Sequence, residues 1–268
     1  MSSFRAPLVR DVITAAGPDS ARYLHSQLSN TVDSLRVGDS CHAFVLQPTG
    51  RVVALLRVTH TAPETFEIDT DEGFGAALLE RLNRFKIRVK CDLVLGTSTM
   101  WALRNLDSAT MELAMQIPGA RRAWRESCGA IDVPTAVDDV AALVPTVGTH
   151  DDLEIARVRC GWPKMGTELT DESMVAETDV VDVAVSFTKG CYPGQELVER
   201  MDSRGASAPR RLVVLPANGC VVGAPYVVDA ETVGRVTSVA GDFAIVSVVR
   251  AHLDRVADVR RDATTQPQ

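Results

Sequence analysis

The chain has 268 residues, 46% of them hydrophobic and 24% charged, with a formal net charge of −7. That length suffices for one large domain or two to three small ones, each with its own core. The acidic balance argues against direct nucleic-acid binding through general electrostatics, because phosphate contacts need a basic surface. The longest apolar runs, such as Val52 to Leu56, fall far short of the ~18 residues of a membrane span, so we expect no membrane partner.

The N-terminal segment and the cysteines indicate the compartment. Arg5, Arg10 and Asp11 stand where a secretory signal would need a continuous apolar stretch, so we expect a cytoplasmic protein. The six cysteines are widely and irregularly spaced without any CxxC, which predicts neither a disulfide framework nor a zinc site. We expect most of them to be buried as small apolar residues: Cys41, Cys91, Cys128, Cys160, Cys191 and Cys220.

Apolar spacing predicts a first half that mixes strands and helices. A period of two is typical of strands and a period of 3.6 of helices, and glycine or proline turns separate the segments. We expect strands over residues 8–14, 35–37, 43–46, 51–57, 65–69 and 87–95, and helices over residues 21–28 and 73–85.

The second half predicts a second, overlapping lobe and then a separate β lobe. We expect strands over residues 100–103 and 111–117 and a short helix over residues 138–143. Beyond a linker over residues 203–209, four short apolar segments joined by glycine turns predict a small β-barrel or sandwich: residues 211–215, 226–228, 233–239 and 243–249.

Residues 180–202 contain the candidate site. Their first part alternates and predicts a strand: Val181, Val183, Val185 and Phe187. A loop with two glycines and a proline follows, and Cys191 lies in it, two residues after Lys189 and just before an expected helix start. A nearby cation and helix N-terminal amides both favour a thiolate or a bound anion. An inert cysteine in a tight turn and a thiol hydrolase or redox site remain open alternatives, although no histidine base lies nearby in sequence.

Metal ligands and nucleotide loops are not indicated. The histidines show no HxH or HExxH spacing, and neither GxGxxG nor GxxxxGK[ST] occurs. We therefore expect no metal site and treat the five histidines as surface or satisfied core residues: His25, His42, His60, His150 and His252.

The loop sequence resembles that of a known family. The run KGCYPGQE from Lys189 to Glu196, followed by Val198 and Arg200, is similar to the signature KGC-aromatic-x-GQE-x-V-x-R of the YgfZ family. These are folate-binding proteins related to the aminomethyltransferase (T-protein) of the glycine cleavage system. The resemblance covers nearly the whole chain, since further segments agree in order: residues 17–24, 49–52 and 234–238.

The resemblance implies both fold and function. The implied fold is α+β and aminomethyltransferase-like, with two interlocked lobes in residues 1–204 and a C-terminal β-barrel lobe in residues 205–268. The implied function is to assist assembly, insertion or repair of iron-sulfur clusters in client enzymes, with an indirect effect on tRNA modification. The implied ligand is tetrahydrofolate or another reduced folate, and the implied partners are folate and the client enzymes.

The resemblance also assigns roles within the loop. Cys191 is expected to be a reactive thiolate beside the folate opening, with a pKa that Lys189 lowers. Gly190 and Gly194 are expected to shape the loop around the folate. The other expected folate-binding residues are Tyr192, Gln195, Glu196 and Arg200. One cysteine cannot hold a four-thiolate cluster, so any cluster contact must be shared with a partner.

Two departures from the aminomethyltransferases bear on activity. Their catalytic aspartate corresponds to Ala54 and Leu55 here, which can neither take nor give a proton. A glutamate that helps to hold the pterin corresponds to Arg159, so an acceptor for two ring N–H groups is missing. We therefore do not expect a conventional enzyme; the alternative is a folate-dependent aminomethyltransferase or demethylase-type one-carbon enzyme.

Overall fold

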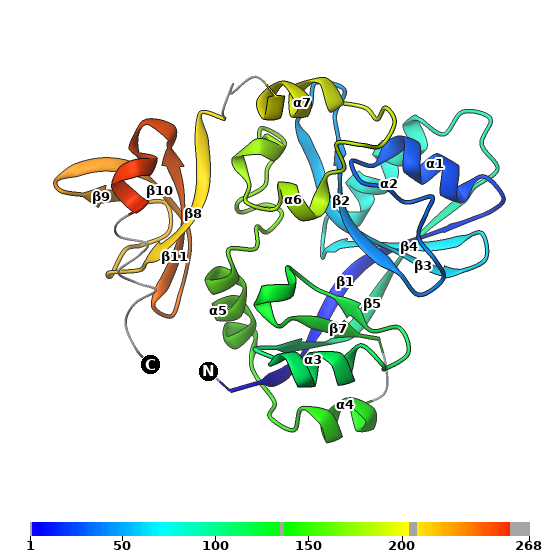
Figure 1. Ribbon diagram of the computed structural model, residues 1–268, viewed down its shortest axis with the longest axis horizontal. Coiled ribbons are helices and arrows are strands. Elements are labelled where there is room, and N and C mark those ends of the chain that lie inside the picture. The colour runs from blue at the N-terminus through cyan, green and yellow to red at the C-terminus, as the bar shows by residue number, and fades with distance from the viewer. Residues whose placement is uncertain (1, 135–136, 204–207, 258–268) are drawn as a thin grey trace.

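The computed structural model describes residues 2–134, 137–203 and 208–257 (Figure 1). The strands are β1 (Phe4–Ala16), β2 (Ser40–Leu46), β3 (Val52–Ala62), β4 (Thr65–Asp71), β5 (Asp92–Arg104), β6 (Arg121–Arg122), β7 (Ile131–Val133), β8 (Arg210–Pro216), β9 (Pro225–Val228), β10 (Glu231–Ala240) and β11 (Phe243–Val249). The α-helices are α1 (Ser20–Gln27), α2 (Gly75–Arg84), α3 (Ser108–Ala114), α4 (Val137–Leu143), α5 (His150–Cys160), α6 (Val181–Ala184) and α7 (Gln195–Ser203). Short 3-10 helices are η1 (Glu126–Cys128), η2 (Val175–Glu177) and η3 (Arg250–His252).

One long strand pair joins the two N-terminal lobes. β1 and β5 pair antiparallel along their whole length, in a seven-stranded sheet of order β2-β3-β4-β1-β5-β7-β6. β4 pairs with the second half of β1, whereas β7 pairs with the far end of β5. The two lobes therefore share their central strands, and Figure 1 shows β1 and β5 running from one lobe into the other.

Each lobe buries its own core against this sheet. In the first lobe, α1 and α2 cover the sheet with leucines one helical turn apart: Leu24, Leu28, Leu78 and Leu82. In the second lobe, residues of α3 and α4 pack on Leu103 and Ile131 of the sheet. The leucines whose spacing predicts α1 and α2 are therefore the residues that these helices bury.

The C-terminal strands form an antiparallel sheet of order β8-β11-β10-β9, as their alternation predicts. Leu212 and Ile245 of this sheet pack on Val158 of α5, so α5 lies between the C-terminal sheet and the N-terminal lobes (Figure 1). In the part of the chain that is described, β8 and β9 remain at opposite edges, and the expected barrel is an open sheet. The expected boundary at residue 204 lies outside the described residues.

Two predicted strands are wrong. Residues 35–37 form a turn in which Leu35 N donates to Val32 O at 3.1 Å. Residues 111–117 lie in and after helix α3, because the Asp107 carboxylate accepts from Thr110 N at 2.7 Å and caps a helix that buries Met111 and Ala114. The apolar run is too short to distinguish a strand from a helix by its spacing, and the side-chain cap at Asp107 favours the helix.

The strand predicted from Val181 to Phe187 is also wrong. Val181–Ala184 is the one-turn helix α6. The carbonyls of Val183 and Ala184 accept from the side chains of Asn30 and Ser29, at 3.1 and 2.6 Å, rather than from a neighbouring strand. Alternating valines indicate a strand only where a sheet edge satisfies the backbone, and here two side chains do so.

The prediction for residues 87–103 needs its boundaries moved. The expected strands at 87–95 and 100–103 are one continuous strand, β5, which begins only at Asp92. Arg88 has a φ of 56°, which is incompatible with an extended strand. The alternation before Asp92 therefore belongs to an irregular connection.

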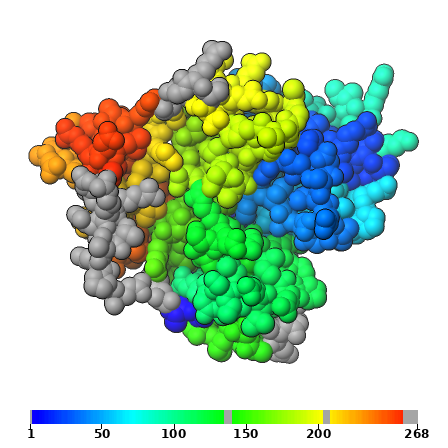
Figure 2. All heavy atoms as spheres, in the orientation of Figure 1, coloured from blue at the N-terminus to red at the C-terminus, as the bar shows by residue number. Residues whose placement is uncertain are grey.

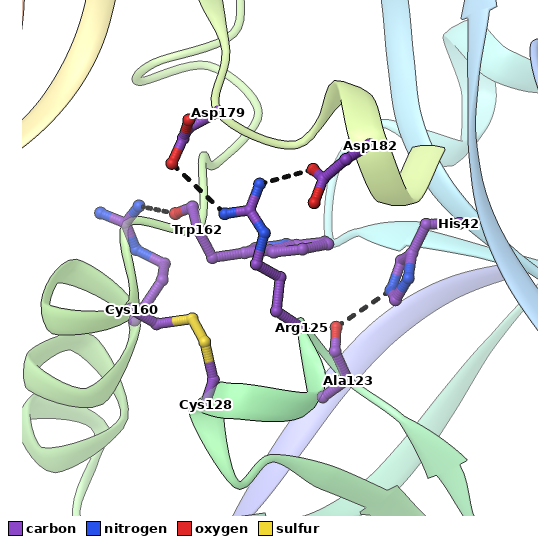
Figure 3. Close-up of a disulfide and its surroundings, with 9 residues drawn as sticks. His42, Ala123, Arg125, Cys128, Cys160, Trp162, Asp179 and Asp182 are labelled. Atoms are coloured by element: carbon purple, nitrogen blue, oxygen red, sulfur yellow. Dashed lines mark hydrogen bonds and ion pairs between the residues drawn. A yellow bond between two sulfur atoms is a disulfide. The ribbon is translucent and has the colours of Figure 1, made fainter. Parts of the chain in front are cut away.

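The prediction that the cysteines form no disulfide is wrong for one pair. Cys128 at the end of η1 and Cys160 at the end of α5 are bonded, with Cα atoms 5.8 Å apart (Figure 3). Of the remaining cysteines, Cys91 is buried, Cys191 is exposed, and Cys41 and Cys220 are half-buried. The partners are 32 residues apart, so sequence spacing carries no sign of the pairing; it follows from the packing of η1 against α5.

Candidate functional site

A cavity of about 110 Å³ opens where the shared sheet meets α5 and the loop that follows α5. Its walls come from β1 to β5, β7, the segment before η1, and residues 150–164. The lining residues are Leu8, Arg10, His42, Leu55, Leu56, Arg57, Asp69, Asp71, Arg104, Ala123, Trp124, Asp132, His150, Leu153, Glu154, Arg157, Trp162, Pro163 and Lys164.

The floor of the cavity is a network of buried arginines and carboxylates. Arg57 bridges two acids, with Nε 2.9 Å from Asp69 Oδ2 and Nη1 2.9 Å from Asp132 Oδ2. Arg104 Nη2 reaches the other oxygen of Asp132 at 2.9 Å, and Arg10 Nε reaches Asp69 at 3.0 Å. Removing one member would leave a buried charge without its partner, so the network holds the strands of both lobes in register.

The charges of this network keep its acids ionised. Burial alone raises the pKa of Asp132, but Arg104, Arg57 and Arg10 outweigh it and lower the pKa to about 2. Burial likewise opposes ionisation of Asp69, and the same balance keeps its pKa below the usual value. Neither group exchanges protons at neutral pH, which makes them poor general acids or bases.

Helix α5 supplies a second ion-pair group on the cavity wall. Arg157 Nη2 pairs with Glu154 at 2.6 Å, and Arg157 Nη1 pairs with the fully buried Glu168 at 2.9 Å. Arg157 Nη2 and Glu168 Oε1 both bond Ser238 Oγ on β10, at 2.7 and 2.6 Å. The C-terminal sheet is therefore tied to the cavity wall through polar contacts as well as through its apolar face.

Aromatic rings form the remaining walls. The His42 ring lies edge-on to the Trp162 indole, with centroids 4.7 Å apart, and Figure 3 shows the two rings side by side. The Arg104 guanidinium lies 4.3 Å from the Trp124 ring centroid. Leu55 and Leu153 add apolar surface. Flat aromatic walls with polar groups between them suit a heteroaromatic ring.

His42 is held in one protonation state. Its Nε2 lies 3.0 Å from Ala123 O, and a carbonyl only accepts, so Nε2 carries the proton (Figure 3). Burial, and then the charge of Arg57, lower the pKa of His42 to about 4. The imidazole is therefore neutral near pH 7, and its Nδ1 is an acceptor.

Ala54 and Leu55, which we expect at the position of the aminomethyltransferase aspartate, lie at or next to this cavity. Leu55 lines it, and Ala54 is fully buried in the core beneath α1 and α2. Neither side chain takes or gives a proton.

The predicted KGC loop lies apart from the cavity, on the other side of a shared apolar cluster. None of the described residues 189–200 lines the cavity. Tyr192 of the loop and Trp162 of the cavity both belong to the cluster, which also contains Leu55. The space-filling view shows the segment that carries the loop and α7 at the surface (yellow, Figure 2). The loop thus supports the cavity wall from behind, while the Cys191 side chain is exposed.

Lys189 is turned toward helix α1 rather than toward solvent. Its Nζ donates to the carbonyls of His25 and Leu28, the latter at 2.5 Å, and so caps the end of α1. Burial lowers the pKa of Lys189 to about 8, against the opposing effects of Asp33, Cys41 and Cys191. Lys189 therefore has a defined structural contact that its sequence motif did not indicate.

The remaining loop residues divide into buried and exposed groups. Tyr192 is buried, and Gln195 Oε1 accepts from Tyr192 N at 3.1 Å. Glu196 and Arg200 are exposed on α7. Gly194 has a φ of +86°, and a Cβ there would lie 2.5 Å from Gln47 O, so only glycine fits against the turn between β2 and β3. The loop and that turn, two segments of the family resemblance, meet in space.

Arg159, which we expect at the position of the pterin-binding glutamate of the aminomethyltransferases, does not line the cavity. Its side chain is exposed, and its guanidinium lies 5.9 Å from the Phe243 ring of β11. Glu154, on the same helix, lines the cavity instead. Arg159 is therefore not among the residues that line the cavity.

Sequence reasoning missed most of the cavity. His42 has no neighbouring histidine, and Arg57 is 12 and 75 residues away from the two acids that it bridges, Asp69 and Asp132. The local contacts are confined to α5 and the loop after it, where Arg157 bonds Glu154 three residues earlier and the carbonyl of Trp162 five residues later, at 2.6 Å. The members from β1 to β5 and β7 come together through the sheet topology.

Comparisons with known proteins agree with this architecture. The crystal structure of the glycine cleavage system aminomethyltransferase T from Bartonella henselae matches with a TM-score of 0.70 and 16% identity, over 92% of this chain and 79% of that chain. The expected aminomethyltransferase-like fold is thus confirmed. No protein-family model matches the chain.

Curated relatives narrow the class. The mitochondrial iron-sulfur cluster assembly factor IBA57 homolog of Pyricularia oryzae is 29% identical over 224 residues, 79% of this chain and 57% of that protein. The mitochondrial IBA57 of Mus musculus is 28% identical over 258 residues, 82% of this chain and 70% of the relative. An uncharacterized protein of Haemophilus influenzae is 25% identical over 219 residues, 77% of this chain and 71% of that protein.

The fold is that of the aminomethyltransferases, and the cavity lies where its shared sheet meets α5. In sequence, the chain is similar to the IBA57 iron-sulfur cluster assembly factors at 28 to 29% identity, in line with the YgfZ-family resemblance of its loop. It spans only 57% of the length of the Pyricularia relative. No helix among the described residues is long and apolar enough to cross a membrane.

Proposed function

We propose that the protein binds a reduced folate and assists the assembly, insertion or repair of iron-sulfur clusters in client enzymes. The observation that carries this proposal is the similarity to proteins named iron-sulfur cluster assembly factors over about four fifths of the chain. The aminomethyltransferase fold and its ring-lined cavity support folate as the ligand. Client enzymes that modify tRNA would account for an indirect effect on tRNA modification.

The cavity residues fit the edge of a folate ring system. Trp124, Trp162 and Leu55 would cover the ring faces, and His42 offers an acceptor to a ring N–H group. A volume of about 110 Å³ is below the ~150 Å³ of an engineered cavity that holds benzene, so the rest of a bound folate would lie at the mouth. Lys164, which also lines the cavity, would offer a cation for its carboxylate tail. When bound, a reduced folate supplies a ring that carries one-carbon units.

The KGC loop is the proposed contact for client enzymes and their clusters. Cys191 is an exposed free thiol, and the loop that carries it is fixed by Lys189, Tyr192 and Gly194. Among the described residues, no three side chains of histidine, cysteine, aspartate or glutamate lie together as metal ligands. A cluster would therefore be substrate, held jointly by Cys191 and ligands of the partner.

We place this activity in the cytoplasm. Four of the cysteines are free thiols, a usage typical of a reducing compartment. The Cys128–Cys160 bond is the exception. Rapid maleimide trapping in intact cells would report that bond, and a fully oxidised pair there would argue for an oxidising compartment instead.

Folate binding can be measured on the purified protein. Titration with tetrahydrofolate is expected to quench tryptophan fluorescence, because Trp124 and Trp162 line the cavity. The quenching should persist in Trp101→Phe, whose indole packs in the core of the second lobe, and fall in Trp124→Phe. Saturable quenching that is equal in both variants would place the ligand elsewhere, and no binding by the wild type would remove folate from the proposal.

The role of the thiol needs a cellular test. In cells deleted for this gene, wild-type protein is expected to restore the activities of iron-sulfur enzymes, and Cys191→Ser is expected to restore them incompletely. Cys220→Ser, which removes a half-buried thiol of the C-terminal lobe, serves as the matched control. Full restoration by Cys191→Ser would show that cluster delivery does not use this cysteine.

A further inference from the structure

The four acids that line the cavity are all paired with arginines. Asp69, Asp71, Asp132 and Glu154 each bond an arginine of the same cavity. Asp71 also accepts from Met165 N at 2.9 Å, and Glu154 binds Arg157 with both of its oxygens. Asp69 and Asp132 are buried, so a ligand N–H group could reach them only by displacing an arginine, which is costly. Asp71 and Glu154 are partly exposed, but each of their oxygens already accepts from a protein donor.

His42 adds an acceptor that is not shared with a protein donor among the described residues. The Ala123 carbonyl holds the ring proton on Nε2, at 3.0 Å, and the Trp162 indole fixes the ring plane through their edge-on contact. Nδ1 is then left with a lone pair, and no hydrogen bond to it is found among the described residues. Since the tautomer and the orientation are both set by neighbours, the lone pair is positioned before a ligand arrives.

We infer that His42 determines ligand specificity, with Nδ1 accepting a hydrogen bond from an N–H group on the ring edge of the ligand. This inference rests on the proposed folate binding. It assigns to His42 Nδ1 the acceptor role that a glutamate at position 159 would otherwise have. A ring ligand without an N–H on that edge would leave Nδ1 unpaired and bind more weakly.

Two substitutions separate this role from a purely structural one. In His42→Gln, the side-chain amide can extend as far as Nε2 did and donate to Ala123 O, but the acceptor at the position of Nδ1 is lost. His42→Asn places its amide oxygen near Nδ1 but is too short to reach Ala123 O. Specific recognition predicts that His42→Asn binds tetrahydrofolate more tightly than His42→Gln, whereas a structural role alone predicts the reverse order.

The experiment is a tetrahydrofolate titration of the wild type and both variants, with 15N-histidine NMR of the wild type. We expect roughly a 10-fold loss of affinity in His42→Gln, a smaller loss in His42→Asn, and a ligand-induced shift of the Nδ1 signal but not of Nε2. Equal affinities for the wild type and His42→Gln, or an unmoved Nδ1 signal at saturation, would overturn the role of His42 and leave folate binding intact. Absence of binding by the wild type would overturn both proposals. If the variants fail to fold, the NMR result on the wild type decides.

Discussion

At the scale of single residues, His42 combines burial with a fixed tautomer. Burial and Arg57 lower its pKa to about 4, so the folded protein binds a proton less readily than the unfolded chain, where histidine titrates near 6.5. Between these two values the unfolded state holds more protons. The stability that neutral His42 provides is therefore complete above pH 6.5 and is lost as the pH falls toward 4.

This difference predicts an acid-dependent loss of stability. From pH 7 to pH 5, the wild type should lose about 2 kcal/mol of unfolding free energy through His42. His42→Gln lacks that titration, and its stability should fall less over the same interval. Urea unfolding at the two pH values measures both slopes. Asp69 and Asp132 do not interfere, because their pKa values lie below this window. Parallel slopes would show that His42 is not buried as described.

At the scale of elements, the two glycines of the KGC loop differ in a way that the motif does not show. Gly194 has a φ of +86° and lies against the backbone of Gln47, whereas a Cβ on Gly190 would meet nothing within 4 Å. Gly194→Ala should therefore cost about 2 kcal/mol or more of unfolding free energy, through strain and overlap. Gly190→Ala, the matched control, should stay within about 0.5 kcal/mol. Thermal unfolding compares the two.

Two other results for Gly190→Ala would each change the interpretation of this loop. If Gly190→Ala lowers iron-sulfur enzyme activities in cells without lowering stability, then Gly190 serves a contact with a partner rather than the loop conformation. Loss of stability in Gly190→Ala would instead contradict the open surroundings of this residue.

The disulfide ties two elements that build the same cavity wall. Cys128 ends η1, which follows Trp124, and Cys160 ends α5, just before Trp162. Closing a loop of 32 residues stabilises the folded state by about 3–4 kcal/mol in the chain-entropy description. The double variant Cys128→Ser/Cys160→Ser should show this loss in urea unfolding under non-reducing conditions. Reduction of the wild type should reproduce it, while an unchanged midpoint on reduction would mean that the bond is absent in solution.

The sequence predicted elements better than it predicted the site. Four C-terminal strands and helices α1 and α2 follow from periodicity, because each buries one face against a single partner. Helix α3, which contains Met111, was predicted as a strand because the side-chain cap that starts it, Asp107, lies outside the apolar run. Helix α6 was missed since Ser29 and Asn30, more than 150 residues away, satisfy its carbonyls.

The KGC loop could be recognised from the sequence, whereas the cavity could not. The motif lies on a loop, where local sequence is recognisable by itself. The cavity joins residues such as Arg57 and Asp132, which are 75 positions apart and carry no local pattern. Sequence reasoning therefore identified the loop and the fold, while the ring-binding walls emerged only from the assembled sheet.

At the scale of the whole molecule, Arg157 connects the C-terminal sheet to the cavity. It is buried and bonds Glu154 on its own helix, Glu168 in the following loop, and Ser238 on β10. Burial alone lowers the pKa of Arg157, but Glu154 and Glu168 outweigh this and raise it. The side chain of Glu168 is fully buried, so its charge depends on this one arginine.

Replacing Arg157 should therefore destabilise the molecule strongly. Arg157→Met leaves the buried Glu168 carboxylate without its cation and should cost about 3–5 kcal/mol of unfolding free energy, measured by urea denaturation. Arg159→Met, two residues along the same helix, removes an exposed arginine and should change stability by about 0.5 kcal/mol at most. Adding Glu168→Leu to Arg157→Met should recover much of the loss, because no buried charge then remains. A loss in the double variant as large as in the single one would assign the effect to packing between α5 and the C-terminal sheet rather than to charge.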